Sequence, residues 1–111
     1  MSETEDALTK ECVTYPIDVA AATTTVVRAV GAGHRWHLMG FYIRAEGHET
    51  MTLLSAATPI TGPVDLDDTN VFHLPIGKVP HMSGRATGEN FSIITGVGAQ
   101  ISGWATIAEE K

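Results

Sequence analysis

The feature that most constrains the fold is a period-two pattern near the C-terminal end of the sequence, beside a glycine-rich turn. From 99 to 107 the odd positions are small or aliphatic, and the even positions are mostly polar: Gln100, Ser102, Trp104 and Thr106. A period of two is typical of a β-strand with one buried face. Gly96-Val97-Gly98 separates this segment from residues 88–95, and glycine tolerates the positive φ of tight turns. The sequence therefore predicts a closing β-hairpin.

The longest apolar segment, residues 34–45, also predicts a strand. An unbroken alternation assigns one face to Trp36, Leu38, Gly40 and Tyr42, and the other to His37, Met39, Phe41 and Ile43. Because both faces are largely apolar, we expect a central strand that is covered on both sides. Residues 50–55, which follow a turn at Gly47, are the expected antiparallel partner.

The other segments favour short strands joined by turns. Residues 23–30 are rich in β-branched side chains, which favour strands. Residues 70–75 fit an edge strand, because Pro75 has no N–H to donate to a ladder. No segment has a helical period. The sequence therefore predicts an all-β fold, a small antiparallel β-sandwich of the jelly-roll-like kind.

The N-terminal segment differs from the rest in composition. It is acidic and polar, with Glu3, Glu5, Asp6 and Glu11 among the first 11 residues. Leu8, Val13, Tyr15 and Pro16 are the residues that would supply its contacts with a neighbour. We expect an extended acidic arm over residues 1–15, which becomes ordered only on a neighbour, and a single β-sandwich domain over residues 16–111, a size that suits one thin core. The alternative for residues 1–11 is a solvated, disordered terminus.

Charge and cysteine content exclude several classes of function. The net charge is −6, and the four arginines are scattered along the chain. Nucleic-acid binding needs several basic side chains on one face, so neither nucleic acid nor an anionic membrane is an expected partner. The acidic N-terminus is unlike a signal peptide, and no apolar run approaches the ~20 residues of a membrane span. Cys12 is the one cysteine, so no intrachain disulfide can form, as suits a reducing compartment.

No residue pattern predicts catalysis, a metal site or a cofactor. His34 and His37 are three apart and would point to opposite faces of a strand, so they are poor candidates to share one ion. Asp65, Asp67 and Asp68 resemble a calcium loop only in charge, and a solvated turn is the stronger interpretation. Cys12 lies beside acidic residues, which disfavour a reactive thiolate. We therefore expect a protein that is not an enzyme.

The aromatic residues are the remaining candidates for binding. For Trp36 and Tyr42 the stronger interpretation is core packing. Trp104 differs, because its neighbours on the same predicted face are Ser102 and Thr106. A large aromatic side chain on a hydroxyl-lined face can anchor a protein interface or stack on a sugar. Gln100, Ser102, Trp104 and Thr106 therefore form the predicted partner surface.

A resemblance to a known kind of protein emerges from the order of turn and strand motifs. The motifs are Thr52-Leu53-Leu54-Ser55-Ala56-Ala57-Thr58, Ile60-Thr61-Gly62-Pro63-Val64, Leu74-Pro75, Gly88-Glu89-Asn90-Phe91-Ser92-Ile93 and the final glycine-rich segment. Over residues 34–108 the chain resembles small tailed-bacteriophage virion proteins. It has Ser55-Ala56-Ala57-Thr58 where that type often carries a glycine, and residues 1–11 lie outside the match. The motifs mark strands and turns rather than catalytic residues.

The resemblance implies a structural function. Proteins of this type look like head decoration (cement) or fibre-attachment modules, often trimeric. The leading hypothesis is a non-enzymatic protein that binds the major capsid protein on the outer surface of a phage head as a homotrimer and stabilises it. It would be assembled in the host cytoplasm and reside in the virion. The alternative hypothesis is a carbohydrate- or receptor-binding jelly-roll module of a phage fibre or tail, in which Trp104, Tyr42 and the loops that carry His and Asn would bind the ligand.

Overall fold

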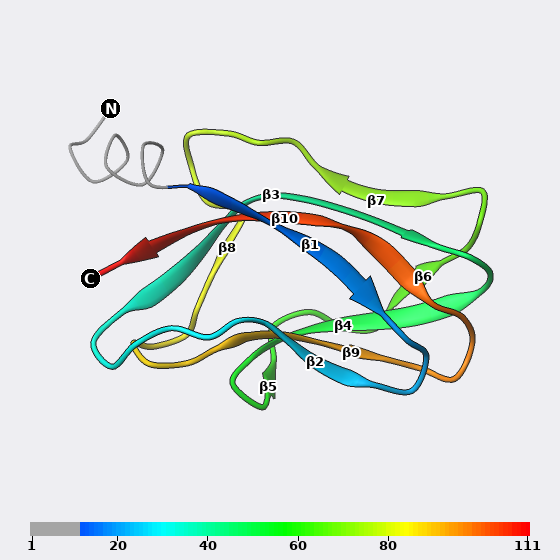
Figure 1. Cartoon of the computed structure of the whole chain (residues 1–111), viewed down its shortest axis with the longest axis horizontal. Coiled ribbons are helices and arrows are strands. Elements are labelled where there is room, and N and C mark those ends of the chain that lie inside the picture. The colour runs from blue at the N-terminus through cyan, green and yellow to red at the C-terminus, as the bar shows by residue number, and fades with distance from the viewer. Residues whose placement is uncertain (1–11) are drawn as a thin grey trace.

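The computed structural model describes residues 12–111, and all of their regular secondary structure is β (Figure 1). The described strands are β1 (Val13–Val19), β2 (Thr24–Arg28), β3 (Arg35–Ala45), β4 (Glu49–Ser55), β5 (Thr58–Pro59), β6 (Val64–Leu66), β7 (Val71–Leu74), β8 (Met82–Ser83), β9 (Phe91–Thr95) and β10 (Ile101–Glu110). No helix among these residues is long and apolar enough to cross a membrane.

The strands form two antiparallel sheets that pack face to face as two layers (Figure 1). Sheet A has the order β1-β10-β3-β7, with β8 also paired to β3, and sheet B has the order β2-β9-β4-β5, with β6 also paired to β4. Pairing proceeds from the ends of the chain inward: β1 with β10, β2 with β9, β3 with β7, and β4 with β5 and β6. This nested pairing rolled into two sheets is a jelly roll. The predicted fold class is confirmed.

The core lies between the two sheets and is built around three aromatic rings. Trp36 of sheet A and Phe91 of sheet B have ring centroids 4.6 Å apart, and Phe41 meets Phe91 edge-on at 6.3 Å. Aliphatic side chains from the inward positions of both sheets fill the remaining space. On β10 these positions are Ile101, Ala105 and Ile107, as the period-two pattern predicts.

The predicted closing hairpin is wrong, because β9 and β10 lie in different sheets. Residues 96–100 cross from sheet B to sheet A and pass close to the start of β4. A Cβ atom at Gly98 would lie 1.9 Å from the His48 carbonyl oxygen, and one at Gly96 would lie 2.5 Å from Thr50 Oγ1. Neither glycine has a positive φ. Glycine is therefore required here by close approach to β4 and not by the geometry of a tight turn.

The predicted pairing of residues 34–45 with residues 50–55 is wrong for a related reason. β3 belongs to sheet A and β4 to sheet B, so the three residues between them connect the two sheets at the surface instead of closing a hairpin within one sheet. β3 is nevertheless a central strand, as expected, since it pairs with β10 on one side and with β7 and β8 on the other. The expected edge strand at 70–75 is confirmed as β7, at the edge of sheet A.

A β-bulge in β3 changes which side chains share a face. Thr106 lies opposite Gly40, whereas the next residue, Ile107, lies opposite Leu38. Met39 is therefore an extra residue on β3 and shifts the period of two by one. Trp36, Leu38, Phe41 and Ile43 all belong to the core, whereas Tyr42 is on the outer face. The predicted face of Tyr42 and its predicted core packing are wrong, while the core packing of Trp36 is confirmed.

The edge strand β1 includes the last residues of the predicted arm. Val13, Thr14 and Tyr15 lie opposite Ile107, Thr106 and Ala105 of β10, so these three residues belong to sheet A. The remainder of the predicted arm, including Leu8, lies outside the described residues.

Candidate functional site

The outer face of sheet A carries a row of side chains that crosses four strands. Pro16 lies opposite Trp104, Trp104 opposite Tyr42, and Tyr42 opposite His73. The rings of Trp104 and Tyr42 are nearly parallel, with an interplanar angle of 13° and centroids 6.2 Å apart. His73 meets both rings edge-on, at 5.8 Å from Tyr42 and 6.2 Å from Trp104. We call Trp104, Tyr42 and His73 the aromatic row.

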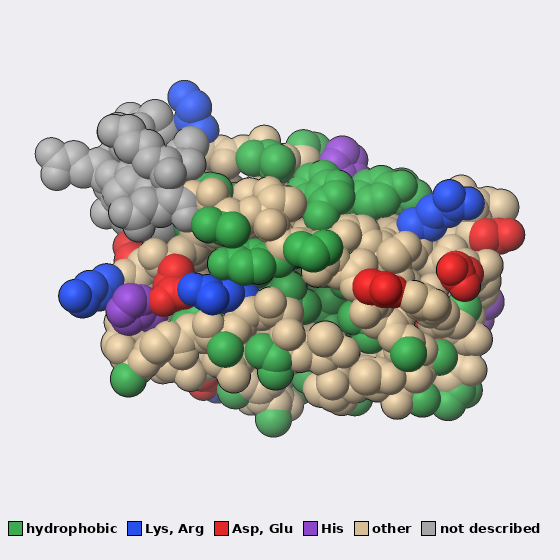
Figure 2. Space-filling view, viewed as in Figure 1, with side chains coloured by type: hydrophobic (Ala, Val, Ile, Leu, Met, Phe, Trp, Pro, Cys, Tyr) green, Lys and Arg blue, Asp and Glu red, His purple; other side chains and the backbone are tan. Residues whose placement is uncertain are grey.

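The aromatic row is open to solvent. Trp104 and Tyr42 are half-buried and His73 is exposed. In Figure 2, hydrophobic side chains gather along the upper side of the molecule, which sheet A forms, with acidic and basic side chains toward the right. Because part of each ring faces solvent, the aromatic row is a candidate binding surface.

A polar pocket adjoins the aromatic row. Two residues further along the strands, Ser102 of β10 lies opposite Arg44 of β3. These two residues and Ala45, Glu46 and Asp68 line a pocket of about 380 Å³. Within residues 12–111, the side chains of Arg44, Glu46 and Asp68 form no hydrogen bond or ion pair. Their donors and acceptors are therefore available to a bound molecule.

Several residues of the predicted partner surface lie together on this face. Pro16, Ser102 and Gln100 are exposed, and Trp104 is half-buried between Pro16 and Tyr42. Gln100 donates a hydrogen bond through Nε2 to the Asp18 carboxylate of β1. Val13, the first residue of β1, is also exposed.

Two residues of the predicted surface, Thr106 and Tyr15, contribute to packing within the protein instead. Thr106 is only 3% exposed, and its hydroxyl is 2.8 Å from the hydroxyl of Thr14. Tyr15 packs against the core, and the Arg28 guanidinium lies 5.5 Å from the centre of its ring. Both side chains help to hold β1 in place, so neither offers much surface to a partner.

Sequence reasoning favoured core packing for Tyr42, kept it beside Trp104 only for the carbohydrate- or receptor-binding alternative, and did not consider His73 or Arg44 for this surface. The bulge at Met39 places Tyr42 and Arg44 beside Trp104 and Ser102, and a simple alternation cannot anticipate an added residue. His73 joins the row only because β7 pairs with β3 across a long separation in sequence. The glycine that follows Met39 is the one local signal of irregularity, since glycine inside a strand often marks a bulge.

A second surface lies on the opposite side of the sandwich, on the outer face of sheet B. It is an open groove of about 590 Å³ that no charged side chain lines. Val26 and Ile94 are 52% and 40% exposed there, whereas Leu54 and Ser92 are nearly buried at its base. The groove is lined by Thr24, Val26, Thr52, Leu54, Ala56, Ala57, Pro59, Asn90, Ser92 and Ile94.

A hydrogen-bonded chain of Ser83, His37 and Glu110 resembles a catalytic serine arrangement. His37 Nδ1 is 2.6 Å from Ser83 Oγ, and His37 Nε2 is 3.2 Å from Glu110 Oε1. Acyl transfer also needs free backbone donors near the nucleophile. The N–H that follows Ser83, that of Gly84, already donates to the Trp36 carbonyl, and His37 is only 7% exposed. The arrangement is therefore suited to joining β8, β3 and β10.

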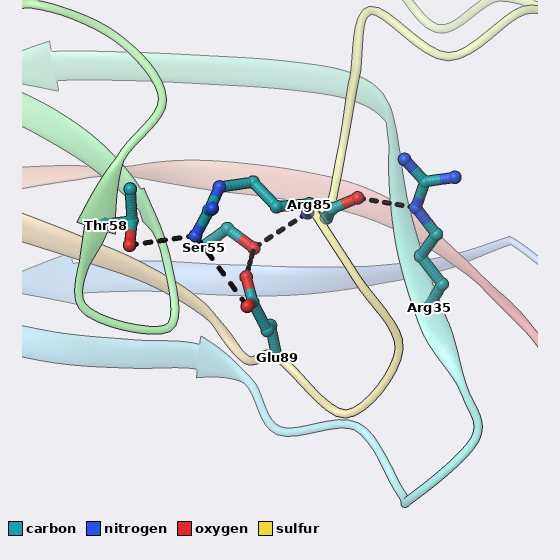
Figure 3. Close-up of polar contacts among 6 residues, drawn as sticks. Arg35, Ser55, Thr58, Arg85 and Glu89 are labelled. Carbon is teal, nitrogen blue, oxygen red and sulfur yellow. Dashed lines mark hydrogen bonds and ion pairs between the residues drawn. The ribbon is translucent and has the colours of Figure 1, made fainter.

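A buried hydroxyl organises the segment before β9 (Figure 3). Ser55 donates through Oγ to Glu89 Oε1 at 2.7 Å and accepts from the Arg85 backbone N–H at 3.0 Å. Arg85 donates through Nη1 to Thr58 Oγ1 at 2.9 Å, and Arg35 donates through Nε to the Gly84 carbonyl at 2.5 Å. Ser55 is fully buried, so its hydroxyl is closed to a substrate although the Glu89 carboxylate accepts a hydrogen bond from it. The network attaches residues 84–89 to β3, β4 and β5.

Several other titratable residues have local partners or a changed pKa. Asp67 accepts hydrogen bonds from the side chain and backbone of Thr69 and from Asn70, and the pKa of Asp67 is therefore lowered. His81 lies 2.7 Å from the Pro75 carbonyl oxygen, and His48 lies 3.9 Å from Asp65. Burial raises the pKa of the Cys12 thiol. Within residues 12–111 no three His, Cys, Asp or Glu side chains are grouped to hold a metal ion.

An ionic cluster closes one end of the sandwich. Arg28 of β2 approaches Glu109 of β10 at 2.5 Å, and His34 contacts the other oxygen of the same carboxylate. Burial raises the pKa of Glu109, but hydrogen bonds and charge interactions with Arg28 and His34 outweigh it, so the net effect is a lowered pKa. Because β2 is in sheet B and β10 in sheet A, the cluster joins the two sheets.

Comparison with known proteins identifies the fold and leaves the family open. No protein-family model matches the chain, and no curated protein matches it. A solved structure of Bacillus endospore appendages, which form a family of disulfide-linked pili, is similar in fold. The TM-score is 0.50 at 14% sequence identity, over 90% of this chain and 86% of the other. At this identity the likeness concerns the fold alone.

Proposed function

We propose that the chain is a non-enzymatic structural subunit that associates with its own copies, and that it decorates and stabilises the outer surface of a phage head. The observation that carries the proposal is the exposed apolar groove on the outer face of sheet B. Large exposed apolar patches mark interaction surfaces in soluble proteins.

The groove of sheet B is the surface that best fits contact between protein subunits. Val26 and Ile94 expose aliphatic side chains beside the hydroxyls of Thr24 and Thr52, without a charge in the lining. Burial of such a surface is favourable because it removes apolar area from water and leaves no unpaired charge. Weak contacts of this kind become strong when many copies bind a repetitive surface together.

The fold likeness agrees with a structural role without identifying the assembly. The Bacillus endospore appendages are pili, and pili are built from protein. The phage head, the major capsid protein and the homotrimer come from the sequence resemblance alone. They are the more specific part of the proposal.

Self-association is tested by size-exclusion chromatography with light scattering on the full chain. We expect a mass that is a multiple of 11.8 kDa, with a trimer as the expected state. The double variant Val26→Thr and Ile94→Thr keeps β-branched side chains at both strand positions, so it should fold and should lose self-association. Val97→Thr is the matched control, since Val97 is 89% exposed and lies outside the groove. A wild-type chain that is monomeric at all concentrations contradicts the proposal.

The decoration of phage heads is tested on purified virions. Mass spectrometry of the particles and antibody labelling in electron micrographs should detect the chain on the head surface. Deletion of residues 1–11, which precede β1, tests the predicted contact of the arm with a neighbouring chain. We expect lower occupancy on the head after the deletion. Unchanged occupancy argues against the arm, and absence of the chain from virions argues against the head as its location.

A further inference from the structure

The aromatic row and the polar pocket beside it have the two properties that a sugar-binding site combines. A pyranose ring has an apolar face of C–H groups and an edge of hydroxyl groups. Aromatic rings stack on the apolar face, and planar polar side chains bind the hydroxyls. The rings of Trp104 and Tyr42 stack on each other at an interplanar angle of 13°, and each remains partly exposed, so the outward side of this pair is the apolar part of the site. Arg44, Glu46 and Asp68 supply the polar groups.

We propose that the outer face of sheet A binds a neutral saccharide, with one pyranose ring on the aromatic row and the next in the polar pocket. Ser102 and Trp104 are two residues apart on β10, which corresponds to about 7 Å along a strand. The two parts are thus close enough to be covered by a disaccharide. The pocket volume of about 380 Å³ is also within the range of small-molecule sites.

The polar groups of the pocket favour a neutral ligand. Sugar hydroxyls both donate and accept hydrogen bonds, and the pocket offers the donors of a guanidinium and the acceptors of two carboxylates. Because the carboxylates of Glu46 and Asp68 outnumber the Arg44 guanidinium, an anionic sugar would be repelled. Among residues 12–111 these side chains have no hydrogen-bond or ion-pair partner that a ligand would have to displace.

The two tryptophans allow a direct test by nuclear magnetic resonance. The chain contains Trp36 and Trp104, so a ¹⁵N-labelled sample has two indole N–H signals. Trp36 is fully buried in the core, whereas Trp104 is on the proposed site. Maltose, cellobiose, lactose and chitobiose are titrated as probes, since they differ in linkage and hydroxyl orientation. We expect at least one of them to shift the Trp104 signal and to leave the Trp36 signal unchanged.

Variants separate stacking from hydrogen bonding. Trp104→Ala should weaken the affinity about tenfold or more, and Trp104→Phe, which keeps a ring, should weaken it less. Arg44→Ala should weaken affinity about three- to tenfold through lost hydrogen bonds, while the aromatic row is unchanged. Binding by the tryptophan variants is followed through the backbone amide signals of Tyr42 and Ser102. Ile94→Ala, on the outer face of sheet B, is the matched control and should bind the sugar like the wild type.

Three results would overturn the inference. The first is that no probe at millimolar concentration moves the Trp104 signal. The second is that binding persists unchanged in both Trp104→Ala and Arg44→Ala. The third is that the Trp104 signal shifts with protein concentration and not with sugar, which would assign this face to a second copy of the chain. A monomer that binds sugar would contradict the proposed assembly and support this inference, so the two are tested separately.

Discussion

The Glu49 carboxylate accepts a hydrogen bond from the Ala99 backbone N–H at 2.9 Å. Its other oxygen accepts from the Thr50 backbone N–H at 2.8 Å, and Glu49 is only 1% exposed. Glu49 begins β4 in sheet B, whereas Ala99 lies in the connection that leads into β10 of sheet A. A single buried carboxylate therefore fixes the position of residues 96–100, the connection between β9 of sheet B and β10 of sheet A.

Replacement of Glu49 tests this role. Glu49→Ala leaves the Ala99 N–H without its acceptor and removes a buried side chain, so the free energy of unfolding should fall by about 2–4 kcal/mol. Glu49→Gln retains one carbonyl oxygen and should cost about 1–2 kcal/mol. Urea unfolding measures both changes. Exposed Glu46 provides the control, and Glu46→Gln should stay within about 0.5 kcal/mol of the wild type. Equal stabilities for Glu49→Ala and Glu46→Gln would contradict the role.

Gly103 is required by the close contact of β10 with β3. A Cβ atom at this position would lie 1.8 Å from the Tyr42 carbonyl oxygen, and the φ of Gly103 is +157°. Gly103→Ala should therefore destabilise the fold by about 3 kcal/mol or more, because the clash is with backbone that cannot move aside. Thermal unfolding followed by circular dichroism measures the effect. Gly62→Ala is the matched control, since no heavy atom lies within 4 Å of a Cβ there. Similar melting temperatures for both variants would refute the requirement.

The ionic cluster at Glu109 predicts a loss of stability in acid. The pKa of Glu109 is lowered in the folded state from its ordinary value of 4.5, so its contribution to stability is complete above that value. It is lost as the pH falls through the lowered folded pKa, because protonation removes the interactions with Arg28 and His34. When the pH is lowered from 7, the free energy of unfolding should therefore decrease once the pH passes below about 4.5.

Glu109→Gln isolates the contribution of that carboxylate. The variant should be less stable than the wild type at pH 7, and the difference should shrink as the pH decreases below about 4.5. The pKa of Asp67 is also lowered in the folded state, but Asp67 is present in both proteins. Its effect on acid stability therefore cancels in the difference between the wild type and the variant. A stability difference that is the same at pH 7 and at pH 3 would contradict the assignment.

Ser55 should determine the order of the segment before β9. Ser55→Ala removes the acceptor of the Arg85 N–H and the donor to Glu89, at a cost of about 1–3 kcal/mol. Hydrogen exchange at the Arg85 amide should become faster. Thr58→Ala removes an exposed hydroxyl that binds the Arg85 side chain, so exchange at that amide should not change. If both variants alter exchange equally, the buried hydroxyl has no special role.

Features that depend on neighbouring residues in the sequence could be predicted, and features that depend on contacts between distant residues could not. Alternation over residues 99–107 correctly separated the core side chains of β10 from Ser102 and Trp104, because no bulge interrupts that segment on β10 before Thr106. Strand pairing was not predictable in the same way. Gly96 and Gly98 suggested a tight turn, yet their lack of a side chain serves a close contact with His48 and Thr50, which are distant in sequence.

The candidate site was predicted in part for the same reason. Trp104, Ser102 and Gln100 were identified from their own strand. Tyr42 and Arg44 were misplaced or overlooked because one inserted residue, Met39, reverses the faces of β3 beyond it. His73 required knowledge that β7 pairs with β3. The polar pocket combines the end of β3, β10 and the loop at Asp68, so no local pattern contains it.

The nested pairing of strands has a consequence for synthesis of the chain. β10 lies between β1 and β3, so sheet A cannot form until residue 110 has left the ribosome. Until then β1 and β3 expose apolar faces without their main partner, a state that favours chaperone binding or aggregation. The rate of folding should be slow for a chain of this size, because the β1–β10 and β2–β9 pairs join residues that are far apart in the sequence. Completion of β10, and not of any earlier strand, therefore determines when sheet A can close.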